Sequence, residues 1–485
     1  MKLKPLLFSI HRWLGIGMCL LFALWFASGI VMMYVEYPEL TEEERITNLP
    51  DLDISKVYLT PLQAAKSSGE SNSYSRLILS TVLGRPLYQF HNAEGIALAI
   101  FADNGHLFEG LDAESAVDVA IQSGFTRTDD SPTYDKQIVV DQWSVSAVLD
   151  SSRPLHRVQI NDEANTVVYI SHKSGQVVRD TNRNERFWNW MGSTIHWIYP
   201  VQLRRNVDLW IQVIIVVSLI GIVSVVSGTI IGFMRIRVRK PFRGKDISPY
   251  KGFMQWHHVL GLLTLVFIST FIFSGLMSMG PWGIFDSSTS TEAQIAGYTG
   301  GEALNLSELP QPRTNAVHPK IREMEWLKIS NAHYTVSTYS SGKRYVDFGN
   351  STKDNQSLTL LAKVAEAIPN LLPNSKLLSV DFMQEYDDYY YSRHNRYRPL
   401  PIYRAKFDDA ESTWYHVDLT TGEIVNRLTH AGRVERWLFN GLHSLDFQFL
   451  IQHRPLWDIV VIFLSITGLG FSITSVVIGW RRLVS

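Results

Sequence analysis

The sequence predicts an α-helical membrane protein with four transmembrane helices, an internal duplication and two α+β lobes outside the bilayer. Four apolar segments contain no Asp, Glu, Lys or Arg, and each has at least the ~20 residues that a spanning helix needs. The chain also repeats itself at an offset of 246 or 247 residues. The predicted spans are Trp13–Val35, Leu209–Met234, Val259–Met279 and Ile459–Trp480.

Histidines and glycines define the duplication. His11 opens an apolar run that ends at Gly29, and His257 opens an equally long run that ends at Gly275. His196 and His443 each precede, by fourteen residues, a Trp that opens the next apolar run. Three further glycine pairs keep the offset of 247: Gly175/Gly422, Gly221/Gly468 and Gly232/Gly479.

Lys and Arg predict the orientation of the chain. Seven of them crowd the stretch from Arg235 to Lys251, between the second and third spans, and others flank both termini. The positive-inside rule therefore puts both termini and this loop in the cytoplasm. The net charge of -1 results from nearly equal numbers of basic and acidic residues, and it indicates no class of partner. The predicted organisation is 1–35 (tail and first span), 36–206 (first lobe), 207–234 (second span), 235–256 (basic loop), 257–280 (third span), 281–456 (second lobe) and 457–485 (fourth span and tail).

The two lobes are predicted to combine helices with strands. In the first lobe, Thr60-Pro61 begins a capped helix, and 113–122 is a second one. Strands are expected at 76–83, 87–91, 96–101, 155–160 and 166–171, separated by Gly, Pro and Asn turns. The second lobe repeats the last pair at 402–407 and 413–417.

The four duplicated histidines are candidate ligands of b-type haem. Spans one and three run in the same direction, so His11 and His257 are expected at the cytoplasmic edge, and His196 and His443 at the opposite edge. Two haems, one between each pair, would lie ~27 Å apart at 1.5 Å per residue. Cys19 is the only cysteine, which excludes disulfides, thiolate clusters and covalent haem attachment.

Two alternatives remain open at these positions. His258 competes with His257, because an offset of 247 aligns it with His11, although His257 keeps the spacing to the glycine one turn later. A histidine at a membrane edge can also be an ordinary interfacial residue. Gly15 and Gly261 would leave room for a porphyrin face, and small residues such as Gly228 and Gly232 also allow plain helix packing.

A cluster of aromatic and basic residues occupies positions 386–398 of the second lobe. Such a cluster could dock an anionic or catecholate iron chelate through Arg and ring contacts. The alternative is an edge loop that packs against the rest of the lobe. The predicted docking residues are Tyr390, Tyr391, Arg393, Arg396 and Arg398.

Several motifs resemble the bacterial PepSY-associated transmembrane family over essentially the whole chain. They are His11-Arg12-Trp13-Leu14-Gly15, Arg153-Pro154-Leu155-His156-Arg157, Glu185-Arg186-Phe187-Trp188-Asn189-Trp190, His196-Trp197-Ile198-Tyr199-Pro200 and Tyr389-Tyr390-Tyr391-Ser392-Arg393-His394. The resemblance implies PepSY-like periplasmic lobes and a bacterial inner-membrane location. Members with an assigned role are reductases that use b-type haems to deliver electrons to ferric siderophores, so it also implies haem and electron transfer.

The resulting hypothesis is an inner-membrane haem reductase that passes electrons to a periplasmic ferric siderophore or other iron chelate. Quinol or a cytoplasmic reductase is the expected donor, membrane lipid is a partner, and no nucleic acid is expected. The alternative is a non-enzymatic, membrane-anchored PepSY binding or regulatory protein. A transporter is disfavoured because the sequence predicts no charged or broken helix at mid-membrane.

Overall fold

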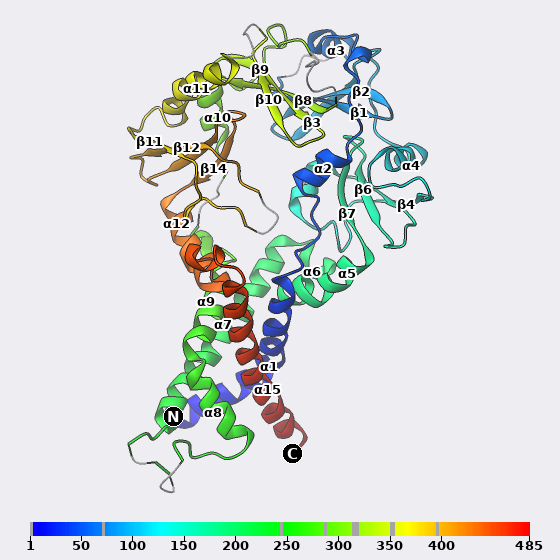
Figure 1. Cartoon of the computed structure of the whole chain (residues 1–485). Helices are drawn as coiled ribbons and strands as arrows, with labels where there is room; N and C mark the ends of the chain where they lie inside the picture. The colour runs from blue at the N-terminus through cyan, green and yellow to red at the C-terminus, as the bar shows by residue number, and fades with distance from the viewer. Residues whose placement is uncertain are drawn as a thin grey trace. The chain divides into compact units, whose positions relative to one another are not determined.

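The computed structural model describes residues 3–69, 73–239, 241–242, 246–285, 289–312, 320–349, 355–393 and 397–485 (Figure 1). The chain forms two compact units. The helical unit comprises Met1–Tyr37, Glu185–Asp286 and Ala431–Ser485, and the sheet unit comprises Pro38–Asn184 and Ser287–His430. Each unit therefore contains residues from both halves of the duplication.

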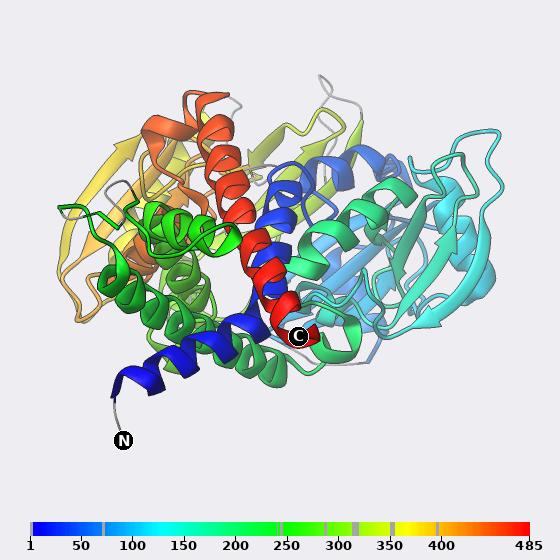
Figure 2. The ribbon, with the colours of Figure 1, turned by 90° about the horizontal axis from the view of Figure 1, so that it is seen from below.

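Three long helices of the helical unit are apolar enough to cross a membrane: α1 (Leu3–Met32), α7 (Val207–Arg235) and α15 (Leu456–Val484). Helices α1 and α15 lie side by side, and α7 packs against α1 (Figures 1 and 2). These helices coincide with the first, second and fourth predicted spans. The chain is a membrane protein, because its helices have the length and composition that a bilayer requires.

The third predicted span is broken. It consists of α8 (Phe253–Leu263) and α9 (Leu265–Met277), which meet at Thr264 with a bend of 71°. The Thr264 hydroxyl donates to the Leu260 carbonyl at 2.7 Å, a back-bond that favours helix bending. The expectation of an unbroken third span is therefore wrong, and the argument it supplied against a transporter does not hold.

Short helical turns precede both α7 and α15. Residues 185–206 and 431–456, which the sequence assigned to the two lobes, belong to the helical unit instead. Each stretch contains one π-helical segment, and the two segments are at matched places in the repeats. The elements are α5 (Arg183–Asn189), η3 (Trp190–Thr194), α6 (Val201–Arg204), α12 (His430–Glu435), η7 (Arg436–Gly441), α13 (Leu442–Ser444) and α14 (Gln448–Ile451). A further short turn, η4 (Pro281–Gly283), follows α9.

A six-stranded antiparallel sheet joins the two polar segments, so they are not separate lobes. The strand order is β10-β9-β8-β1-β2-β3, and Leu77 of β1 lies opposite Trp326 of β8. Each half of the chain supplies three strands, in mirrored order about the β1–β8 pair. The strands are β1 (Arg76–Val82), β2 (Arg85–Asn92), β3 (Gly95–Phe101), β8 (Ile321–Ile329), β9 (Ala332–Tyr339) and β10 (Arg344–Asp347).

Two four-stranded antiparallel sheets complete the sheet unit, one from each half. Their strands are β4 (Thr133–Ile138), β5 (Leu155–Gln159), β6 (Val167–Ser171) and β7 (Val177–Thr181), then β11 (Leu377–Met383), β12 (Ile402–Phe407), β13 (Trp414–Asp418) and β14 (Ile424–Leu428). The strands predicted at 155–160, 166–171, 402–407 and 413–417 are confirmed. The duplication extends to detail, because both sheets have a register shift at equivalent positions, Tyr169/Ile170 and His416/Val417.

Helices cover these sheets and close their cores. Helix α3 (Pro61–Ser67) begins at Thr60 with a capping box to Gln63, as the sequence predicts. The core of the six-stranded sheet mixes both halves, and Trp326 at its centre has no exposed surface. The other helices are α2 (Glu42–Asn48), α4 (Ala113–Gln122), α10 (Glu292–Thr299) and α11 (Gln356–Ala367).

Candidate functional site

The structure brings His11 and His257, here called the inner histidines, close together. His11 on α1 and His257 on α8 have ring centroids 6.2 Å apart, with 38° between the ring planes. Both rings are half-buried. The two residues are equivalent in the duplication, so the pair forms where the two repeats face each other.

The inner histidines are held through Nδ1. His11 Nδ1 donates to the Ser224 carbonyl on α7 at 3.1 Å. His257 Nδ1 lies 3.1 Å from the Ser475 hydroxyl on α15, and that hydroxyl donates to the Phe471 carbonyl. Because the hydroxyl proton is already used, its oxygen accepts from the imidazole. Both rings therefore carry their proton on Nδ1 and present the Nε2 lone pair.

His258 makes hydrogen-bond contacts through both ring nitrogens. It is buried, its Nε2 donates to the Gly232 carbonyl at 3.0 Å, and its Nδ1 lies 2.8 Å from the Ser248 hydroxyl. Both ring nitrogens are thus engaged in holding α8 to the end of α7 and to the preceding loop. Of the two rivals, only His257 faces His11.

The outer histidines form a second pair. His196 and His443 have ring centroids 6.0 Å apart and ring planes at 72°. His196 Nδ1 lies 3.1 Å from the Trp25 carbonyl and from the Ser28 hydroxyl of α1. His443 Nδ1 lies 3.0 Å from the Ser274 hydroxyl of α9, which is the repeat equivalent of Ser28.

The two pairs lie at opposite ends of α1. His11 belongs to the inner pair, and Ser28, seventeen residues further along the same unbroken helix, contacts the outer one. At 1.5 Å per residue this separation is about 26 Å, close to the thickness of the hydrocarbon core.

The π-helical segments precede the outer histidines. Segment η3 ends two residues before His196, and η7 ends two residues before His443. A π turn rotates the residues that follow it relative to an α-helix and is frequent at functional sites. These segments were not predicted from the sequence, in which Gly192 and Gly441 within them are a visible signal.

The centroid spacing of both pairs matches that of two imidazoles on one iron. A nitrogen ligand lies about 2.0 Å from the metal, and an imidazole ring has a radius of about 1.15 Å. Opposed imidazoles on one iron therefore have centroids about 6.3 Å apart, and the two pairs measure 6.2 Å and 6.0 Å. Among the described residues no group of three or more His, Cys, Asp or Glu could hold a bare metal ion, so a porphyrin would have to supply the remaining donors.

A cavity of about 770 Å³ adjoins the inner pair, within the range of about 300–1,000 Å³ typical of cofactor pockets. Its walls are mostly apolar and aromatic, and His11 and His257 both line it. Gly15 and Gly261 also border the cavity, as the sequence analysis expected of residues beside a porphyrin. The apolar lining includes Phe8, Phe22, Phe26, Leu262, Leu265, Ile268 and Phe471.

A glycine on α7 makes room for His11. A Cβ added at Gly228 would lie only 2.5 Å from His11 Cε1. At the outer pair, Cβ atoms at Gly29 and Gly275 would lie 3.4 Å from His196 Cε1 and 3.6 Å from His443 Cε1, which are ordinary contacts. The close approach of α7 to α1 at Gly228 therefore serves the histidine as well as helix packing.

The predicted docking cluster is partly buried in the sheet unit. Tyr390 has no exposed surface: its hydroxyl donates to the Pro399 carbonyl and its ring stacks on His416 at 4.8 Å. Its side chain is therefore structural rather than a docking contact. Tyr391, Arg393 and Arg398 are half-buried, and the Arg398 guanidinium lies over the Tyr390 ring. His394 and Arg396 lie outside the described residues.

A polar cavity of about 420 Å³ lies in the sheet unit beside the β1–β8 pair. Buried ion pairs border it: Glu323 accepts two hydrogen bonds from Arg45, at 2.8 and 2.9 Å, and Glu325 pairs with Arg76. Burial raises the pKa of Glu323, but the charge and hydrogen bonds of Arg45 outweigh it and leave that pKa below its usual value. Burial, and then the charge of Arg76, lower the pKa of His91 to about 4.

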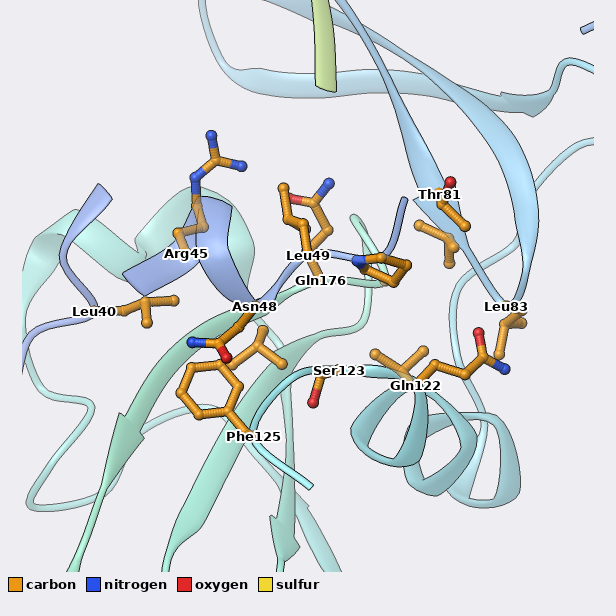
Figure 3. A pocket seen from close by; sticks show the side chains of 15 residues that line it. Leu40, Arg45, Asn48, Leu49, Thr81, Leu83, Gln122, Ser123, Phe125 and Gln176 are labelled. Carbon is orange, nitrogen blue, oxygen red and sulfur yellow. The ribbon is translucent and has the colours of Figure 1, made fainter. Parts of the chain in front are cut away.

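A smaller pocket in the sheet unit has no room for a ligand. It lies between α2, the end of β1 and the end of α4, with Asn48, Thr81 and Gln122 around it (Figure 3). Its volume of about 20 Å³ holds about one water molecule. This pocket is a packing gap.

Comparison with known proteins agrees with the helical architecture. The family described as PepSY-associated TM region matches residues 8–482, nearly the whole chain. The chain belongs to this family. The match includes all four paired histidines and both polar segments. No curated protein matches the chain.

Proposed function

We propose that this protein carries electrons across the inner membrane through two b-type haems and delivers them to a ferric chelate in the periplasm. The observation that carries the proposal is the presence of two histidine pairs, each with Nδ1 anchored to a neighbouring helix and each with the spacing of two axial ligands. Bound haem would supply a one-electron iron centre at each pair.

The chain's own residues would hold and tune these centres. His11 and His257 would ligate the inner haem, and His196 and His443 the outer one. Their Nδ1 hydrogen bonds to carbonyls and hydroxyls fix the ring orientation and raise the basicity of Nε2, as in other metal sites. The apolar cavity walls at the inner pair would exclude water and thereby stabilise a haem that has no covalent attachment.

The expected orientation sets the direction of transfer. The positive-inside rule puts both termini in the cytoplasm and the sheet unit in the periplasm. Electrons from quinol or a cytoplasmic reductase would then enter at the inner pair and leave at the outer one. Arg393 and Arg398, with Tyr391, would dock an anionic ferric siderophore, with Arg396 a further candidate from its sequence position.

Haem content tests the proposal directly. A pyridine haemochromogen assay on purified protein should give close to two b-type haems per chain, and a ferric siderophore added to the dithionite-reduced protein should reoxidise them. A haem content near zero would remove both the cofactor and the reductase function. A content near one would leave one pair as the only cofactor site.

The second candidate function is a non-enzymatic, membrane-anchored binding protein. The polar cavity of about 420 Å³ in the sheet unit favours it, because a cavity lined by Arg, Glu and His is suited to a charged ligand. The same spectrum separates the two candidates: a binding protein shows no reducible Soret band.

A further inference from the structure

Four cations border the cavity that contains the inner histidines. Arg12 follows His11 on α1, Lys251 precedes α8, and Arg481 and Arg482 lie near the end of α15. All four are exposed. The residues that line the cavity include no Asp or Glu.

These cations form no salt bridge with any residue in the part of the chain that the structure describes. The Arg481 guanidinium lies 5.1 Å from the centroid of the Phe253 ring, which holds it beside the start of α8. The cavity thus has an apolar interior with three imidazoles, of which His11 and His257 face each other, and a rim of cations that have no carboxylate partner among the described residues.

We propose that Arg12, Lys251, Arg481 and Arg482 bind the two propionate carboxylates of the haem at the inner pair. This inference rests on the proposed function, because it requires haem between His11 and His257. Haem b has an apolar macrocycle and two carboxylates on one edge, and the cavity offers the complementary distribution of apolar walls and cations. Arg forms bidentate, charge-assisted hydrogen bonds with a carboxylate, whereas Lys provides a compact charge.

The cationic rim would also fix the orientation of the cofactor. Two axial imidazoles leave a porphyrin free to rotate about the axis between them. Cations on one rim of the cavity remove that freedom by binding one edge. The propionate edge would then face the end of the helical unit where α1 begins and α15 ends (Figure 1).

A comparison of haem with its dimethyl ester tests the inference, because the ester keeps the macrocycle and iron but lacks the two charges. The full chain carrying His196→Ala and His443→Ala retains only the inner pair. It would be prepared free of haem in phosphatidylcholine nanodiscs and titrated at the Soret band with each compound. We expect haem to bind about ten-fold more tightly than the ester, the effect of one charge-assisted hydrogen bond or more.

Substitutions of the rim cations test whether they cause the preference for haem over the ester. Arg481→Gln with Arg482→Gln should reduce it at least several-fold, and the Arg→Lys pair should keep most of it. The matched control is Arg237→Gln with Arg239→Gln, a pair in the basic stretch from Arg235 to Lys251 that does not line the cavity, and it should leave the preference unchanged. If the histidine variant does not fold, the same titrations are made on the wild-type chain. Only one of its two haem-binding phases should then differ between haem and the ester.

Three results would overturn the inference. Equal binding of haem and ester would mean that the cations serve lipid headgroups at the membrane surface. Loss of the preference in the control pair would mean that general basic charge is responsible. If the wild-type chain binds neither compound, the proposed function itself fails, which is distinguishable from the first result because no Soret band develops.

Discussion

Gly228→Ala should damage the proposed inner haem site, between His11 and His257, while leaving the fold intact. The added Cβ would lie 2.5 Å from His11 Cε1 and 3.0 Å from Nδ1, whereas non-bonded carbon atoms prefer about 3.5–4.0 Å. The ring must therefore retreat by about 1 Å or more. It can do so by rotating, but this motion breaks its hydrogen bond to the Ser224 carbonyl and moves Nε2 away from His257.

The expected magnitude follows from the cost of overpacking. Inserting a methyl group into a packed site costs about 1–3 kcal/mol, which corresponds to about 5- to 150-fold in affinity. Because the strained atoms belong to a ligand ring, the loss should appear in haem binding rather than in global stability. Haem content should fall from two per chain towards one, with unchanged circular dichroism and gel-filtration behaviour.

Two alanine substitutions serve as matched controls. Gly275→Ala places a Cβ 3.6 Å from His443 Cε1, an ordinary contact, and Gly17→Ala on α1 meets nothing within 4 Å. Both should retain two haems. If Gly228→Ala also retains two haems with unchanged reduction potentials, the close approach of α7 to the inner histidine does not constrain a ligand, and the inner pair loses its structural support.

Three further predictions concern individual residues. His257→Ala should remove the inner haem, whereas His258→Ala should keep both haems. The second change should lower the free energy of unfolding by about 1–3 kcal/mol, because it leaves the buried partners of His258 unsatisfied. Haem assays and thermal unfolding distinguish the two variants, and exchanged outcomes would contradict the pairing of His11 with His257. Glu323→Gln breaks a buried ion pair with Arg45 and should destabilise the sheet unit by about 3–5 kcal/mol. Glu42→Gln removes a carboxylate whose side chain is 72% exposed and should cost less than about 1 kcal/mol. Protease resistance of the sheet unit measures both losses, and equal losses would contradict a stabilising role for the buried pair. The His91 pKa of about 4 lies below the ordinary 6.5, so between these pH values the unfolded chain binds a proton that the folded chain does not. The free energy of unfolding should therefore fall as the pH drops through this window. His91→Gln should make this pH dependence weaker, as melting curves recorded across the window would show.

The spans and the histidine pairing were accessible from sequence for clear physical reasons. An apolar run without charges has few alternatives to crossing a bilayer, so α1, α7 and α15 lie where the pattern predicts them. Duplicated histidines at matched depths predicted which rings would meet. The choice between His257 and His258 needed the structure, because it depends on hydrogen bonds to Ser248 and Gly232 that are distant in sequence.

The bend of the third span, which is local, and the burial of Tyr390, which depends on tertiary contacts, could not be predicted. Thr264 lies in an apolar run that reads as one continuous helix, and membrane helices tolerate Thr without bending. Its local backbone and its bond to Leu260 become visible only in the structure. Likewise Tyr390 stands in a basic, aromatic stretch typical of a surface, yet it packs on His416 of β13, and strand β12 lies between the two in sequence.

The duplication explains why histidines pair at two places in the described part of the helical unit. In each unit, equivalent elements of the two repeats meet: β1 pairs with β8 in the sheet unit, and His11 faces His257 in the helical unit. Such a pseudo-two-fold contact is self-complementary, so a residue close to the axis meets its own copy. One histidine near the axis therefore becomes a pair of facing histidines without any other change in sequence. Residues far from the axis gain no such partner, which leaves them free to diverge. The aromatic and basic cluster at 386–398, whose repeat equivalent lacks these residues, is then the expected place for a function that only one half performs.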